Sequence, residues 1–137
     1  MTHRFLPHTA DILVELEAST LSGLFHEATE VVRGLLAGDA AVDRVEVRHI
    51  SVAASGADEL LHHYVRELLT VFQVDTFVPA GLEVQALTST ELRGIVSGET
   101  FDSRKHEPQP EVKAVTRHQL RVEQTGSIWR GTMVLDM

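Results

Sequence analysis

The amino-acid sequence predicts an α+β fold in which two amphipathic helices pack on one face of a mainly antiparallel β-sheet. Two segments carry apolar residues spaced three and four positions apart, which is the period of an α-helix. Several other segments alternate apolar with polar residues or are rich in β-branched side chains, as strands are. Short turn sequences separate the strands, which favours antiparallel pairing. Such a combination is typical of a two-layer sandwich.

The first strand is predicted over residues 12–18, directly after the sequence PHTAD at residues 7–11. Apolar and more polar residues alternate along it, as in a half-buried strand. Asp11 has the same parity as Glu15 and Glu17. It is therefore predicted to begin the strand on the more polar face of the sheet.

The two helices are predicted from their caps and their apolar stripes. The first is capped by Ser19 or Thr20, both of which are good N-caps, and Gly38 can end it. The second begins at Asp58 and ends before the sequence VPAG at residues 78–81. The two stripes consist of Leu21, Leu24, Phe25, Ala28, Val31, Val32, Leu35 and Leu36, and of Leu60, Leu61, Tyr64, Val65, Leu68, Leu69 and Phe72.

The other elements are predicted to be strands. One covers residues 42–54, between the helices, and the rest follow residue 82. These later strands are LEVQAL, ELRGIVSGE, EVKAVTRH, QLRVEQ and IWRGTMVLDM. In the last strand, Trp129 and every second residue after it share one face, which leaves Asp136 on the opposite face.

Composition narrows the classes of function. The 137 residues, 43% of them hydrophobic, predict a single domain over residues 1–137. The absence of cysteine excludes disulfides and sulfur-ligated metals. A net charge of -8 argues against strong binding of nucleic acid. The sequence lacks membrane-spanning stretches and a signal-peptide pattern, so we expect a soluble, cytoplasmic protein.

Asp11 and Asp136 are candidate ligands for a divalent cation. Asp11 begins one predicted strand, and Asp136 ends another, beside the carboxylate of the terminal Met137. Oxygen ligands of this kind suit Ca²⁺ and Mg²⁺. The site requires the two strands to be antiparallel neighbours, which the sequence leaves open. Taken singly, each acid is typical of a solvated surface residue.

The eight histidines do not form a zinc motif. His62 and His63 are adjacent in the second predicted helix, whereas two ligands on one helix face need an offset of three or four residues. We interpret them as a helix-surface pair. His8 is predicted to brace the turn that orients Asp11.

The segment FDSRKHEPQPE, residues 101–111, is predicted to be either a solvated hairpin tip or a functional loop. Its His106 and Glu107, together with Lys113 and His118 on the following strand, form the densest group of mixed charge. The whole sequence lacks a nucleophile elbow, a glycine-rich phosphate loop and a dinucleotide fingerprint. A self-contained enzyme is therefore the weaker hypothesis.

Several motifs in order make the sequence resemble the archease family. They are PHTAD followed by a strand and a helix, ELL at residues 67–69, GETFDSRKHE, EVKAVTRH, a lone tryptophan and the terminal LDM. The resemblance extends over nearly the whole chain. Two positions depart from the family pattern: Arg117 stands where an aromatic residue is common, and Tyr64 stands where many relatives carry tryptophan.

The resemblance implies a non-catalytic partner protein. Archeases assist RtcB-type RNA ligases, which join RNA ends in tRNA splicing and RNA repair with GTP and Mn²⁺, and they promote ligase guanylylation and multiple turnover. The resemblance also implies a cation site at Asp11, Asp136 and Met137, with Ca²⁺ expected and Mg²⁺ or Mn²⁺ as alternatives. The partner-facing or supporting positions are then His8, Glu67, His106, Glu107, Lys113 and His118.

Two other classes of function stay open. A metal-dependent hydrolase or transferase would need a substrate pocket beside Asp11. A chaperone or protein-modulating module would expose an apolar patch on the sheet face opposite the helices. The sequence leaves the oligomeric state open.

Overall fold

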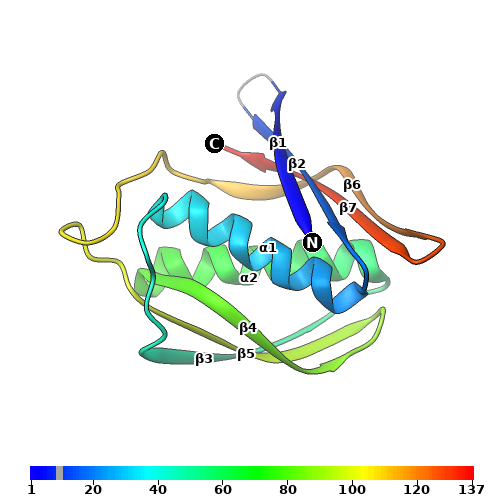
Figure 1. The fold of residues 1–137 in the computed structure, drawn as a ribbon, viewed down its shortest axis with the longest axis horizontal. Helices are drawn as coiled ribbons and strands as arrows, with labels where there is room; N and C mark the ends of the chain where they lie inside the picture. Colours follow the sequence, from blue (N-terminus) through cyan, green and yellow to red (C-terminus); the bar gives the residue numbers. More distant parts are fainter. Residues whose placement is uncertain (9–10) are drawn as a thin grey trace.

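The computed structural model describes residues 1–8 and 11–137, and within them two helices lie between two antiparallel sheets (Figure 1). One sheet has the strand order β1-β2-β7-β6, and the other has the order β3-β5-β4. The strands of the first sheet are β1 (Thr2–His8), β2 (Asp11–Ala18), β7 (Ile128–Asp136) and β6 (Ala114–Thr125). Those of the second are β3 (Glu46–Ala53), β5 (Glu91–Thr100) and β4 (Phe77–Leu87).

Each helix contacts both sheets. α1 (Leu21–Ala37) packs on β2 and β4, and α2 (Ala57–Asp75) packs on β6 and β3. The α+β class and the antiparallel pairing are confirmed, but the strands form two sheets and not the single sheet that we expected. α1 lies between the sheets, because it packs on β2 of one sheet and on β4 of the other. A helix that is buried on more than one side needs a cover on each.

Local sequence sets the bounds of α1 as predicted. The Thr20 hydroxyl accepts a hydrogen bond from the N–H of Gly23 at 2.9 Å, which caps the start of the helix. Gly38 follows the last helical residue with a φ of 67°, a conformation that favours glycine. Its N–H donates to the carbonyl of Gly34 at 2.9 Å and closes the final turn.

α2 begins close to the predicted start and ends, as predicted, before residue 78, but the residues that stop it are not the predicted ones. The helix begins at Ala57, so Asp58 lies in the first turn, where its charge suits the helix dipole. It ends at Asp75, and Thr76 follows in the left-handed conformation. Residues 78–81 do not end the helix but lie buried in β4. In the described part of the chain, no helix combines the length and apolar character that crossing a membrane requires.

Two strands also differ from the prediction. β1 was not expected, although it forms the edge of the four-stranded sheet beside β2. EVKAVTRH and QLRVEQ belong mainly to one strand, β6, whose pairing with β7 shifts register between Thr116 and Arg121. Gln119 within this irregularity has a φ of 54°. A bulge of this kind interrupts the period-two pattern without ending the strand.

The core lies around the helices. Phe25 of α1 and Tyr64 of α2 pack edge to face, with ring centroids 5.5 Å apart. The Tyr64 hydroxyl is 2.6 Å from the hydroxyl of Thr29, so its polar tip is satisfied where it is buried. The helices pack on only one face of the four-stranded sheet, and the opposite face points away from them.

Candidate functional site

Asp11 and Asp136 lie directly opposite each other at one end of the four-stranded sheet. β2 and β7 are antiparallel neighbours, and their register pairs the first residue of β2 with the last residue of β7. The C-terminus lies at this end of the sheet (Figure 1). The geometric condition for a shared site is therefore met.

Both aspartates lie on the face of the sheet that points away from the helices. Val14, Leu16 and Ala18 are buried toward the helices, so residues of the opposite parity in β2, including Asp11, face outward. Directly paired residues of neighbouring strands share a face, which places Asp136 beside it. Both residues are half-buried.

The two carboxylates lack neutralising contacts with the described part of the protein. Among the residues that the structure describes, neither side chain has a hydrogen bond or an ion pair. Like charges directly opposite in a sheet repel. A hard divalent cation, which takes carboxylate oxygens as ligands, would remove this repulsion. The donor set of Asp11 and Asp136 therefore fits such an ion.

Backbone contacts bring Lys113 to the same end of the sheet. The N–H of Lys113 donates to the carbonyl of Asp136 at 2.8 Å, and Ala114 pairs with Asp136 from β6. Gln73 of α2 donates to the Lys113 carbonyl at 3.4 Å. On the other side, the register pairs His8 with Asp11. Thr9 and Ala10 of the PHTAD motif lie outside the described residues.

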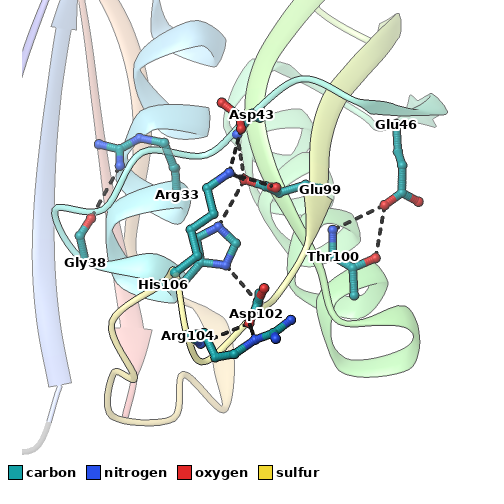
Figure 2. A network of polar contacts seen from close by, with 10 residues as sticks. Arg33, Gly38, Asp43, Glu46, Glu99, Thr100, Asp102, Arg104 and His106 are labelled. Atoms are coloured by element: carbon teal, nitrogen blue, oxygen red, sulfur yellow. Dashed lines mark hydrogen bonds and ion pairs between the residues drawn. The ribbon is translucent and has the colours of Figure 1, made fainter.

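The loop after β5 is built around a buried histidine. His106 is 2% exposed, so its side chain supports the loop and does not face a partner. Its Nδ1 accepts from the N–H of Asp102 at 2.9 Å, which leaves the proton on Nε2. That Nε2–H donates to Glu99 at 3.1 Å, as Figure 2 shows.

Glu99 is the centre of this network, and sequence reasoning did not find it. Lys105 contacts its carboxylate at 2.8 Å, and the N–H of Asp43 donates to it at 2.6 Å (Figure 2). Burial alone would raise the pKa of Glu99, but the hydrogen bonds from Lys105, the Asp43 N–H and His106 outweigh it and lower the pKa to about 2. The sequence feature that could have indicated this network is the presence of Glu99, Lys105 and His106 close together within GETFDSRKHE.

The remaining predicted positions are spread over the molecule. Glu107 is exposed, accepts from the N–H of Asp39 at 3.1 Å and so ties the loop to the end of α1. Glu67 is exposed on α2. His118 is exposed at the register shift of β6. Of the predicted set, the backbone brings Asp11, Asp136, Lys113 and His8 together at one sheet end.

This fold and this pair of carboxylates define a small α+β protein with a candidate cation site at the end of one sheet. The chain matches the Archease protein family (MTH1598/TM1083) over residues 3–137. It therefore belongs to the archease family.

Named relatives match along nearly their whole length. The Protein archease of Methanopyrus kandleri is 32% identical, and the match covers 96% of each chain. The Protein archease of Methanosarcina acetivorans is 28% identical, with 98% of this chain and 95% of the relative covered.

Two solved structures share the fold. Protein 1598 of Methanobacterium thermoautotrophicum, solved in solution, superposes with a TM-score of 0.83 at 22% identity and covers 98% of both chains. An archease of Thermotoga maritima, described as a possible chaperone, has a TM-score of 0.68 at 20% identity and covers 96% of this chain and 94% of its own. At these identities the likeness concerns the fold.

Proposed function

We propose that this chain is a non-catalytic activator of an RtcB-type RNA ligase, which promotes ligase guanylylation and multiple turnover in tRNA splicing or RNA repair. Membership of the archease family is the general support. The observation that carries the proposal is the direct pairing of Asp11 with Asp136. The first and the last motif of the sequence, PHTAD and LDM, meet there through Asp11 and Asp136.

The same site is proposed to hold a divalent cation, with Ca²⁺ expected and Mg²⁺ or Mn²⁺ as alternatives. Asp11 and Asp136 would supply carboxylate oxygens, and Met137 would add an oxygen at the end of β7. The bound ion would supply positive charge between two anions that otherwise repel. The strands contribute rigidity, because their pairing fixes both aspartates before any ion binds.

Charge supports a docking role for this end of the protein. A net charge of -8 steers the chain toward a basic, RNA-binding partner and does not favour its own contact with RNA. In the proposed complex, the cation-bearing sheet end docks near the nucleotide site of the ligase and helps its metals and GTP to adopt a reactive arrangement. Lys113 lies at this end and would contact the partner.

The hydrolase alternative is less well supported. It requires a substrate pocket beside Asp11. Two hollows of the described surface have volumes of about 810 and 550 Å³, and neither is lined by Asp11 or Asp136. Neither of these two hollows therefore offers a substrate pocket at the carboxylate pair, which lies on the outward face of the sheet.

The chaperone alternative rests on the description of the Thermotoga maritima protein as a possible chaperone. An exposed apolar patch on the outer face of the four-stranded sheet would favour it. On that face, Arg4 pairs with Glu15 and Arg130 pairs with Glu17. Charged pairs favour specific docking over general binding of unfolded chains.

The experiment is a multiple-turnover RNA ligation assay with a purified RtcB-type ligase, GTP and Mn²⁺. Wild type should accelerate the ligase and should ligate nothing alone, whereas Asp11→Asn should lose most of the acceleration. Glu15→Gln is the matched control, because it makes the same chemical change on the same strand and face. An active ligase that wild type does not accelerate would contradict the proposal, and full acceleration by Asp11→Asn would remove Asp11 from it.

A further inference from the structure

A second cluster, on α2, has the chemistry of a transition-metal site. We propose that Glu59, His62 and His63 bind one zinc-class divalent cation, with Zn²⁺ as the matching ion. One ligand atom from each of the three residues lies within 4.8 Å of the others. This site is independent of the proposed ligase activation and uses neither Asp11 nor Asp136.

Helical spacing brings the three side chains together. Glu59 precedes His62 by three positions and His63 by four, and both offsets place side chains side by side on a helix. Adjacent histidines alone are poorly spaced, and for this reason the sequence did not suggest zinc. The two imidazole rings nevertheless lie with their centroids 5.7 Å apart, nearly edge to face. Glu59, one helical turn before the two histidines, is the third member of the cluster.

The Nδ1 atom of His62 accepts no hydrogen bond from the described residues. The residue is 3% exposed, and its Nε2 lies 3.2 Å from the carbonyl oxygen of Val115 on β6. A carbonyl only accepts, so Nε2 carries the proton and Nδ1 of the neutral ring carries the lone pair. Among the described residues, this buried Nδ1 has no hydrogen-bond partner. Leaving a buried polar atom unsatisfied is costly, and a metal ion would satisfy it.

His63 is oriented in the same manner. Its Nδ1 lies 3.0 Å from the carbonyl oxygen of Ala53 at the end of β3, so Nδ1–H donates and Nε2 keeps its lone pair. Both histidines therefore donate one ring N–H to a backbone carbonyl. Metal-binding histidines are held by this type of contact, which fixes the tautomer and the orientation of the ring.

The charge state of the Glu59 carboxylate and the environment of His62 also suit a metal site. Arg117 Nε donates to both oxygens of Glu59, at 2.8 and 3.1 Å, and this contact lowers the pKa of Glu59. Burial lowers the pKa of His62. Metals bind ionised carboxylates and neutral imidazoles. The carboxylate keeps further lone pairs for the ion while Arg117 holds it in place.

The donor set selects zinc rather than calcium. Two nitrogens and one carboxylate oxygen are typical zinc ligands, and they leave a fourth tetrahedral position for water. Ca²⁺ takes oxygen ligands, which suits the Asp11 and Asp136 pair. Metal–ligand distances of about 2.0–2.2 Å bring ligand atoms closer together than 4.8 Å. Glu59 and His63, both partly exposed, would move toward the buried His62 on binding.

The test is a calorimetric titration of the chelator-treated full chain with Zn²⁺. Wild type should bind one ion at this cluster, and Glu59→Gln and His62→Gln should each weaken binding at least about tenfold. His49→Gln is the matched control, since it removes an exposed histidine of β3 outside the cluster. Asp11→Asn should also retain wild-type zinc affinity.

His63→Gln provides a second route, because His62 is buried and its replacement could impair folding, which circular dichroism would reveal. His63 is partly exposed, and its variant should fold and lose zinc affinity by a similar factor. Wild-type zinc affinity in both Glu59→Gln and His63→Gln would overturn the proposal. So would a wild-type protein that does not bind zinc, or zinc binding that only Asp11→Asn abolishes.

Discussion

Two acidic regions of this molecule differ in whether their carboxylates have hydrogen-bond and ion-pair partners in the described protein. At the end of the four-stranded sheet, Asp11 and Asp136 face each other, and the described protein provides neither with a cation or a donor. In the loop after β5, Glu99 accepts from Lys105, from His106 and from the N–H of Asp43 (Figure 2). The second region satisfies its carboxylate with donors of its own, whereas the first is the site at which we propose that a cation binds.

The two regions also differ in how deeply their carboxylates are buried. The Glu99 side chain is 13% exposed, and a carboxylate so sheltered is stable only with partners. Asp11 and Asp136 are half-buried at an open sheet end, where water lowers the cost of two unpaired charges. The same change, from carboxylate to amide, should therefore have opposite effects on stability in the two regions.

The largest effect is expected at Glu99. Glu99→Gln removes the charge that three donors share, and it should lower the free energy of unfolding by about 2 kcal/mol, the size of a hydrogen bond to a charged group. Urea unfolding followed by circular dichroism at neutral pH measures it. An unchanged midpoint and slope would mean that the network does not stabilise the loop.

Acid should remove the same contribution without a mutation. The pKa of Glu99 is about 2 in the folded protein, against an ordinary value of 4.5. Its stabilisation is therefore complete above about pH 4.5 and is lost as the pH falls from there to about 2. The difference in stability between wild type and Glu99→Gln should shrink over this range. A constant difference down to pH 2 would show that Glu99 has an ordinary pKa.

The sheet end should respond with the opposite sign. In cation-free buffer, Asp136→Asn removes one of two like charges that face each other, and it should raise the free energy of unfolding by about 0.2–1 kcal/mol. Thermal unfolding with a chelator present measures this change. Destabilisation by Asp136→Asn would indicate that the carboxylate has a structural partner and would remove the contrast.

The smallest effect is expected at Arg104, at the rim of the loop network. Its guanidinium is 90% exposed and lies 3.3 Å from Asp102. Exposed pairs of this kind contribute little, so Arg104→Ala should change the free energy of unfolding by less than about 0.5 kcal/mol. A loss as large as that of Glu99→Gln would mean that the whole loop acts as one network and that Glu99 is not its centre.

Local alternation was enough to predict the face on which Asp11 lies. The period of a strand is two, so Glu15 and Glu17 fixed the polar side, and β2 follows that pattern. The pairing with Asp136 was conditional on which strands are neighbours. That depends on topology, and residues 11 and 136 are almost a chain length apart.

Non-local burial explains what the sequence did not predict. The division into two sheets depends on which strands pair, and α1 contacts β2 of one sheet and β4 of the other. His106 lies in a charged segment and read as a surface residue, yet it is buried under contacts with Glu99 and Asp102. The Asp43 contact with Glu99 joins positions 56 residues apart. No local pattern carries that information.

The central claim is the proposal that Asp11 and Asp136 form a cation site, because the described part of the chain provides neither carboxylate with a partner. Calorimetric titration with Ca²⁺ of wild type, Asp11→Asn and Glu99→Gln tests it most directly. The account predicts binding of one ion by wild type and by Glu99→Gln, and at least about tenfold weaker binding by Asp11→Asn. Equal binding by wild type and Asp11→Asn would contradict it.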